Sequence, residues 1–276
     1  MTIRGLLDAA TQRIGGANAR LEAETLLAHV LAKSRAWLYA WPEHEPDAQQ
    51  RAAYERLVEA RARGEPIAYL TGHREFWSLD LAVTRDVLIP RHETERLVEL
   101  ALARIPENVE SSVADLGTGS GAIALALARE RPRASVLATD ASSAALAVAR
   151  ANAERHELRN VSFAVGDWCE ALGQKVFDVL VSNPPYIASG DAHLDAGDLR
   201  SEPLSALVSG ADGLDAIRRI VGEAPLHLRS GGWLLLEHGW DQAARVREIF
   251  EAHDFVAIST ERDDSGNERV TLAMRP

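Results

Sequence analysis

The sequence predicts an α/β protein in which a small all-helical domain precedes a larger domain built on a mostly parallel sheet. From residue 112 onward, short apolar runs of strand length alternate with helical segments, a pattern typical of a parallel sheet with helices on both faces. Earlier in the chain, apolar residues recur at three- and four-residue spacing, as on amphipathic helices. We therefore predict a helical domain at 1–75, a β-hairpin connector at 76–90 and an α/β domain at 91–276.

Length, charge and cysteine content restrict the class of protein. A chain of 276 residues is long enough for two domains with buried cores. The formal net charge of −11 lies wholly in residues 76–276, which disfavours binding to a nucleic-acid backbone. Cys169 is the single cysteine, and no apolar run is long enough to span a bilayer. We expect a soluble, cytoplasmic protein that binds neither membranes nor nucleic acid directly.

The helices of the first region are expected from their periodicity and their end residues. The runs LEAETLLAHVL and AYERLVEARA have helical apolar spacing. Asn18 and Asp47 are candidate N-caps, and Gly64 is a candidate helix end. In residues 76–90 apolar and polar residues alternate, as they do in a pair of strands joined by a turn. In residues 91–105 the apolar residues have helical spacing. The aromatic residues Trp37, Tyr39 and Trp41 of RAWLYAWPEH are expected in the core of the helical domain, and exposure of some of them as a partner-docking patch is the alternative.

Seven strands and four helices are expected after residue 112. The strand segments are SVADLG, SVLATD, VSFAVGD, VFDVLVS, GGWLLLEHG, FVAIST and ERVTLAM. The helical segments are 121–130, 142–156, 213–228 and 241–253. Only ERDDSGN separates the last two strands, so we expect them to form an antiparallel hairpin that closes the sheet.

A glycine-rich loop joins the first of these strands to a helix. Gly117, Thr118, Gly119, Ser120 and Gly121 follow the strand directly. Glycine has no Cβ and tolerates positive φ, so such a loop lets a ligand approach the backbone closely. A loop of this kind between a strand and a helix predicts a nucleotide-type ligand.

Acidic and aromatic residues at the ends of the next two strands indicate which ligand the loop binds. Asp140 ends its strand where an acid can hold two ribose hydroxyls. Asp167 and Trp168 follow the third strand, where an adenine would lie. A dinucleotide and S-adenosylmethionine are both compatible with the glycine spacing. Asp115, beside the loop, would repel a pyrophosphate but suits an amino group, so we predict S-adenosylmethionine.

The segment SNPPY follows the fourth strand at the ligand-binding edge of the sheet. Pro184 favours an extended backbone at Asn183, and neither Pro184 nor Pro185 has an N–H group. The side-chain oxygen of Asn183 and the carbonyl oxygen of Pro184 are therefore candidate acceptors for the two hydrogens of one amino group. Tyr186 is a candidate cover for a planar substrate. These contacts strengthen as positive charge develops on the nitrogen, which favours methyl transfer to it.

Taken together, DLGTGSG, SNPPYI and LIPRHETE resemble the protein-(glutamine-N5) methyltransferases of the PrmC or HemK type, which modify peptide chain release factors. AYLTGHREFWSLDLAV, EPLSALVSGADGLDAIRRI and GGWLLLEHGWDQ extend the resemblance over nearly the whole chain. The resemblance implies a Rossmann-like seven-stranded class I methyltransferase sheet. It also implies that a class I release factor docks on the helical domain and presents the glutamine of its Gly-Gly-Gln motif.

Carried over by position, the resemblance implies cofactor contacts at Gly117–Gly121, Asp140, Trp168 and Asn183, and substrate contacts at 183–186. One departure is His92, where the family usually has proline. The SNPPY element is shared with amino methyltransferases that act on adenine or cytosine, which is the alternative function. A cofactor-binding protein without catalysis is a third possibility.

Three further expectations concern residues outside these motifs. Glu237 and His238 are expected to be a structural pair at a strand end rather than an acid–base pair. The histidines show no metal-ligand spacing, so no metal is expected. The polar segment 187–212 is expected to be a wall or lid that orders with substrate.

Overall fold

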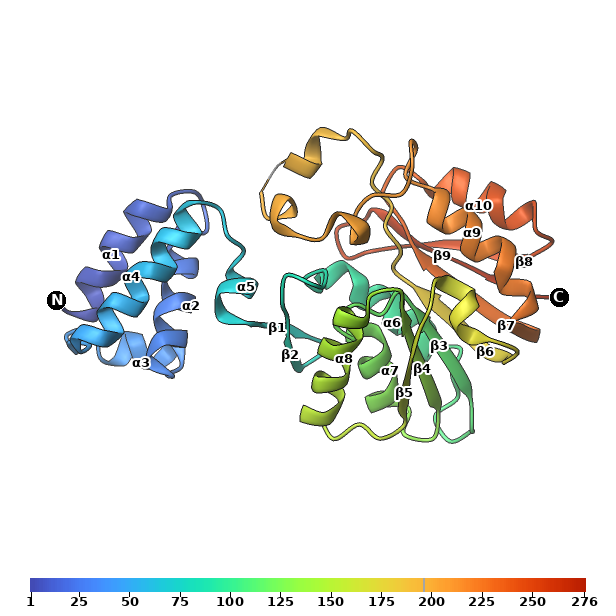
Figure 1. Ribbon diagram of the computed structural model, residues 1–276, viewed down its shortest axis with the longest axis horizontal. Coiled ribbons are helices and arrows are strands. Elements are labelled where there is room, and N and C mark those ends of the chain that lie inside the picture. Colours follow the sequence, from blue (N-terminus) through green and yellow to red (C-terminus); the bar gives the residue numbers. More distant parts are fainter. Residues whose placement is uncertain (196) are drawn as a thin grey trace. The chain divides into compact units, whose positions relative to one another are not determined.

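The computed structural model describes residues 1–195 and 197–276 and divides into two compact units (Figure 1). The first unit comprises Met1–His73 and Asp195–Ser201. The second comprises Arg74–Leu194 and Glu202–Pro276. Among the described residues, no helix has both the length and the apolar character that crossing a membrane requires.

The first unit is helical. Its helices are α1 (Ile3–Ile14), α2 (Ala19–Leu31), α3 (Arg35–Ala40), α4 (Ala48–Ala62) and α5 (Ile67–Thr71). α1, α2 and α4 pack together around buried residues such as Leu6, Leu27 and Tyr54 (Figure 1). Asp47 begins α4 in a reciprocal capping box with Gln50, as the sequence predicted. Asn18 precedes α2 but its side chain makes no capping bond.

The expectation that the aromatic residues of RAWLYAWPEH fill the core is wrong for two of them. Tyr39 is 61% exposed and Trp41 is 58% exposed, whereas Trp37 is partly buried. The helix α3 that contains Tyr39 has only six residues; Leu38 is its one buried residue, and Trp37 packs against the core while partly exposed. The hydroxyl of Tyr39 instead donates to the buried Glu24 at 2.7 Å.

A β-hairpin opens the second unit. Its strands are β1 (His73–Phe76) and β2 (Leu79–Ala82). Residues 83–91 form neither helix nor strand. The expected helix at 91–105 is a 3-10 turn at His92–Thr94 followed by α6 (Glu95–Leu102).

The large sheet has seven strands in the order β5-β4-β3-β6-β7-β9-β8. They are β3 (Ser112–Leu116), β4 (Ser135–Asp140), β5 (Val161–Val165), β6 (Phe177–Ser182), β7 (Leu228–Glu237), β8 (Val256–Arg262) and β9 (Glu268–Met274). The pairs from β5 to β7 are parallel, whereas β9 is antiparallel to both β7 and β8. The predicted fold class is confirmed, including the closing hairpin.

Different helices cover the two faces of the sheet (Figure 1). The helices are α7 (Ala122–Glu130), α8 (Ser143–Arg155), α9 (Asp215–Glu223) and α10 (Ala243–Glu251), in addition to α6. Residues of α6 and α7 belong to one core, and residues of α9 and α10 belong to the other. Successive residues of β3 pack into different cores, because neighbouring side chains of a strand point to opposite faces of the sheet. Val113 belongs to the first core and Ala114 to the second.

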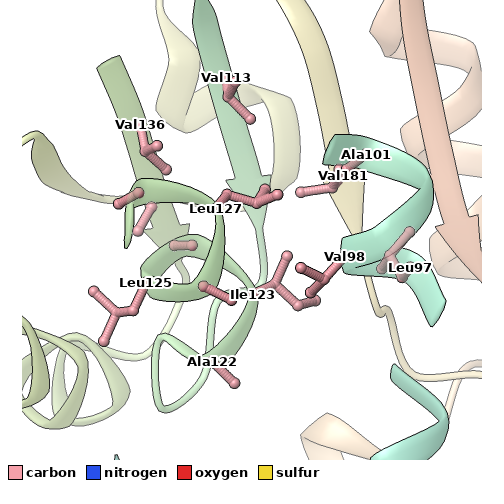
Figure 2. Packing of buried hydrophobic residues seen from close by; sticks show 14 of the residues in the cluster. Leu97, Val98, Ala101, Val113, Ala122, Ile123, Leu125, Leu127, Val136 and Val181 are labelled. Atoms are coloured by element: carbon pink, nitrogen blue, oxygen red, sulfur yellow. The ribbon is translucent and has the colours of Figure 1, made fainter. Parts of the chain in front are cut away.

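The helix α7 is the centre of the first core. Its residues from Ala122 to Ala128 are all buried, so it is apolar on every side, as a core helix is. Figure 2 shows Ile123 of α7 beside Val98 of α6, and Leu127 beside Val181 of β6. This packing fixes the end of the helix that follows the glycine loop.

Replacing Leu127 by alanine should lower the free energy of unfolding of this unit by about 2–5 kcal/mol, because the change leaves a cavity among fully buried side chains. Urea unfolding followed by circular dichroism measures the change. Val109→Ala is the control, since Val109 is exposed and should change stability by less than about 0.5 kcal/mol. A loss below about 1 kcal/mol for Leu127→Ala would contradict the packing described.

Candidate active site

A cavity of about 500 Å³ lies where β3, β4, β5 and β6 end. Parallel strands bring their carboxyl ends to one edge of the sheet, where open α/β folds bind ligands. Most of the residues predicted from the sequence line it, namely Gly117, Thr118, Gly119, Ser120, Asp140, Asp167, Trp168, Asn183 and Pro185. Gly121, Pro184 and Tyr186 are not among its lining residues within the part of the chain described.

The glycine loop has a conformation that requires glycine. Gly117, Gly119 and Gly121 all have positive φ, at +73°, +56° and +87°. A Cβ at Gly117 would lie 3.1 Å from the ring of Trp168. The loop therefore leaves space beside that ring which any other residue would occupy.

Asp140 binds the backbone of the glycine loop and lines the cavity. Its Oδ2 accepts from the backbone N–H of Gly119 at 2.9 Å, and its Oδ1 accepts from that of Ser142 at 2.8 Å. A carboxylate oxygen can accept more than one hydrogen bond, so both oxygens keep capacity for a ligand. The carboxylate is thus held in place by the backbone on both sides and remains on the cavity wall.

Asp115 lies beneath the loop instead of in the cavity, where the sequence argument placed it. It is fully buried and its Oδ2 accepts from the Thr118 hydroxyl at 2.6 Å and from the Ala124 N–H at 3.2 Å. Burial raises the pKa of this carboxyl to about 7, against the effect of the Thr118 hydrogen bond. Its Oδ1 has no hydrogen-bond partner among the described residues. Asp115 therefore supports the loop and the first turn of α7.

Asp167 and Trp168 form the wall that follows β5. Trp168 has a positive φ of +49°, which is uncommon for a non-glycine residue and turns the chain sharply there. Asp167 makes an ion pair with Arg219, which also binds Glu170 at 2.8 Å and Glu223 at 3.0 Å. Arg219 thereby fixes this wall to α9.

Asn183 is held by a residue far away in the sequence. Its Nδ2 donates to the hydroxyl of Thr94 at 3.1 Å. No described residue donates to its Oδ1. Both Asn183 and Thr94 line the cavity, so the amide presents its oxygen as an acceptor there.

Tyr186 points its hydroxyl away from the cavity lining and toward a buried acid. The hydroxyl donates to Oε1 of Glu237 at 3.4 Å, and burial raises the pKa of Tyr186. Its backbone carbonyl accepts from Nε2 of Gln242 at 2.9 Å. A Cβ at Gly213 would lie 2.3 Å from the same carbonyl oxygen, so the chain after the SNPPY segment is closely held.

Glu237 and His238 are both buried but bond to different partners. His238 contacts the Thr271 hydroxyl at 2.8 Å and the Gly239 carbonyl at 2.9 Å, and burial lowers its pKa. Burial raises the pKa of Glu237 to about 7. They are therefore not an acid–base pair with each other.

The cavity also includes residues that sequence reasoning missed. Thr94 and Arg91 lie within LIPRHETE, which was quoted only for its resemblance. Arg91 makes an ion pair with the buried Glu202, which also accepts from the Ile89 N–H at 3.2 Å. Glu202 begins the EPLSAL segment, so this pair fixes that segment at the cavity.

The described part of segment 187–212 is a wall of the cavity. Pro203, Ser205 and Ala206 line it. An isolated parallel bridge joins Ile187 to Val208 and closes the base of the segment. Residue 196 lies outside the described residues, and ordering of the segment with substrate stays a prediction. Within the described residues, no cluster of side chains suits a metal ion.

Two families match the chain in turn. Residues 5–72 match the PrmC N-terminal domain, and residues 93–199 match the methyltransferase small domain. The release factor glutamine methyltransferase of Xylella fastidiosa (strain Temecula1) is 55% identical over 271 residues, covering 98% of this chain and 97% of that protein. The chain belongs to the release factor glutamine methyltransferase family.

Another member of the family is similar over nearly its whole length. The release factor glutamine methyltransferase of Coxiella burnetii is 50% identical over 256 residues, covering 93% of this chain and 92% of that protein.

A solved structure with low sequence identity shares the fold. The hMettl16 catalytic domain in complex with MAT2A 3′UTR hairpin 6 superposes with a TM-score of 0.59. It is 16% identical and covers 83% of this chain and 82% of that one, so it supports the fold alone.

Replacing Asp140 by alanine should weaken binding of S-adenosylmethionine about 10- to 100-fold, because it removes a fixed carboxylate worth about 1.5–3 kcal/mol as a hydrogen-bond acceptor. Isothermal titration calorimetry measures the affinity.

Asp178→Ala is the matched control for Asp140→Ala. Asp178 also accepts a backbone N–H, that of Ser112 at 2.7 Å, but at the amino end of β6. Its loss should leave the affinity within about twofold. Equal losses in both variants would show that Asp140 supports only the fold.

Proposed function

We propose that this protein transfers the methyl group of S-adenosylmethionine to the side-chain amide nitrogen (N5) of a glutamine. The substrate is the glutamine of the Gly-Gly-Gln motif in class I peptide chain release factors. The observation that leads to this proposal is the Asn183 carboxamide, whose nitrogen is bound to Thr94 and whose oxygen is free in the cavity. An acceptor so placed suits an NH₂ group.

The lining residues fit S-adenosylmethionine better than a dinucleotide. Asp140 offers two fixed carboxylate oxygens to a ribose, and Trp168 lines the cavity with its aromatic ring beside the glycine loop. Asp167 adds a second acid to the lining, which disfavours a pyrophosphate. When bound, the cofactor supplies a methyl group on a positively charged sulfur.

The chain's own residues orient the amide nitrogen for attack. The nitrogen of a glutamine side chain is a poor nucleophile because its lone pair is delocalised into the carbonyl. Asn183 Oδ1 accepts one of its hydrogens and directs the lone pair toward the methyl group; the acceptor predicted for the other hydrogen is the carbonyl of Pro184, a buried residue that is not among the cavity-lining residues. Such contacts strengthen as positive charge develops on nitrogen, so they stabilise the transition state more than the ground state. The nitrogen–methyl bond forms as the sulfur–methyl bond breaks, and one proton passes to water.

The helical unit, in this proposal, docks the release factor. It coincides with the residues that match the PrmC N-terminal domain. Exposed Tyr39 and Trp41 give it an aromatic surface, and aromatic residues are enriched where proteins bind each other. Residues 1–75 have no net charge, so this surface does not repel a partner of either sign.

Asn183→Ala should lower kcat about 100-fold or more, because it removes a preorganised acceptor used in the transition state. The assay incubates the purified protein with S-adenosylmethionine and an unmethylated release factor, and peptide mass spectrometry locates the methyl group. A single methyl on the Gly-Gly-Gln glutamine is expected with the unaltered protein.

Duplex DNA serves as a parallel acceptor in the same assay. Methylated adenine or cytosine, with no methyl on the release factor, would replace the proposal by the nucleic-acid alternative. Release-factor methylation that persists in Asn183→Ala would leave the substrate in place but contradict the role of Asn183.

A further inference from the structure

Three polar side chains from separate parts of the chain meet at the cavity wall: the partly buried Asn183 and the buried Thr94 and Glu237. Asn183 directly follows β6, and Glu237 is the last residue of the adjacent strand β7. Ser182 of β6 pairs with Leu236 of β7, so the two residues after this pair lie at the same edge of the sheet. Thr94 precedes α6. The Asn183 amide donates to the Thr94 hydroxyl at 3.1 Å, and this hydroxyl lies close enough to the Glu237 carboxyl to lower its pKa. The fold thus creates a relay from Glu237 through Thr94 to Asn183.

The chemistry of these groups fixes the direction of each hydrogen bond. A carboxylate can only accept, and a threonine hydroxyl has one hydrogen to donate. When Glu237 is ionised, the Thr94 hydrogen is directed to it, and Thr94 offers only lone pairs to Asn183. The end of the amide that faces Thr94 must then be Nδ2, which leaves Oδ1 toward the cavity. Glu237 therefore determines which end of the Asn183 amide the substrate meets.

We propose that Thr94 and Glu237 are positioning residues that hold the Asn183 carboxamide with its oxygen toward the substrate amide. The proposal rests on the proposed function for its catalytic consequence, but the orientation of Asn183 can be observed without substrate. An amide turned the other way would present NH₂ to NH₂, and the substrate would lose one acceptor. Thr94 and Glu237 act through Asn183 and need not touch the substrate.

A contribution to the stability of the fold does not explain why an acidic residue occupies position 237. Its side chain is buried and its Oε2 has no hydrogen-bond partner among the described residues. Burying an acid that is incompletely paired lowers the free energy of unfolding, because its charged form is desolvated. An apolar side chain would suit this position better if only packing were required. A role in the site explains why an acid is found here.

The relay depends on the ionisation of Glu237, and so on pH. Burial raises the pKa of Glu237 to about 7; the Thr94 hydrogen bond, Arg269 and the Tyr186 hydroxyl lower it, and Glu93 raises it. Below this pKa the protonated carboxyl can donate to Thr94, whose hydrogen can then turn toward Asn183. The orientation of the amide is therefore enforced above about pH 7 and is lost as the pH falls through that value.

Thr94→Val should lower kcat about 10- to 100-fold while the KM for S-adenosylmethionine changes less than about threefold. Valine keeps the shape of threonine but cannot hydrogen-bond. Thr94→Ser keeps the hydroxyl and should stay within about threefold of the unaltered enzyme. Equal kcat values for Thr94→Val and the unaltered enzyme, or equal losses for valine and serine, would overturn the proposal.

Thr271→Val is the matched control. Thr271 is also a fully buried threonine, bonded to His238 and Thr260, and it does not line the cavity. Its loss should lower the melting temperature but leave kcat within about twofold. A loss of kcat as large as that of Thr94→Val would show that any buried hydroxyl in this unit has the same effect and would overturn the proposal.

Glu237→Gln tests the pH dependence. Glutamine can donate or accept, so it no longer fixes the Thr94 hydrogen. The unaltered enzyme should lose kcat as the pH falls from 8 to 6, and Glu237→Gln should have a lower kcat that is nearly constant over this range. An unchanged pH profile in the variant would exclude Glu237 as the controlling group.

Nuclear magnetic resonance separates this inference from the proposed function. The chain has six asparagines, so ¹⁵N-asparagine labelling gives six side-chain amide pairs, and the Asn183 pair is the one missing from Asn183→Ala. Relative to the intrinsic exchange rate at each pH, one of its hydrogens should be more strongly protected at pH 8 than at pH 6, and it should be less protected in Thr94→Val than in the unaltered protein. Asn152, which donates to Ala82 and Ser120 carbonyls at 3.0 and 2.9 Å, is the internal control.

These spectra need no release factor. If the Asn183 signal behaves as expected but no glutamine is methylated, the relay stands and the proposed function fails. If methylation occurs but the Asn183 amide is unaffected by Thr94→Val, the proposed function stands and the relay is wrong.

Discussion

The parallel pairing of β3 with β4 and β6 is the constraint on which the site depends. It places Leu116 beside Thr139 and Asp115 beside Val181, so these strands end at the same edge of the sheet. The glycine loop directly follows β3, Asn183 directly follows β6, and Asp140 is the last residue of β4. A slip of one residue would move each of these groups to the opposite face. The buried contacts of α7 on β3 and β4 oppose such a slip, because they fill the first core.

Two buried carboxyl groups hold the cavity in shape from behind. Asp115 binds the loop through Thr118 and the first turn of α7 through Ala124. Glu237 accepts a hydrogen bond from Tyr186, and its pKa is lowered by the nearby hydroxyl of Thr94, the residue to which Asn183 donates. Burial raises the pKa of each to about 7. The cavity thus presents carbonyl and carboxylate oxygens on a support whose own charges depend on pH near neutrality.

The sequence predicted the parts of the structure that follow from local pattern. Alternation of strands and helices gave the sheet and its closing hairpin, and the glycine spacing gave the loop. The hydrogen-bond partner of the Asn183 side chain could not be found in this way. Thr94 is 89 residues earlier in the sequence, and no local sequence pattern predicts a contact between the two residues. The exposure of Tyr39 and Trp41 was only the less favoured interpretation, because apolar character does not tell which side of a short helix faces the core.

The first unit joins two segments that are synthesised at different times, Met1–His73 and Asp195–Ser201. Arg61 of α4 binds Glu22 at 2.8 Å and also Asp198 at 2.9 Å, which is 137 residues later in the chain. The helices leave the ribosome first, but one of their ionic partners is translated only after the sheet strands up to β6 and the SNPPY segment. The amino-terminal helices therefore fold early during translation and acquire their last contact late.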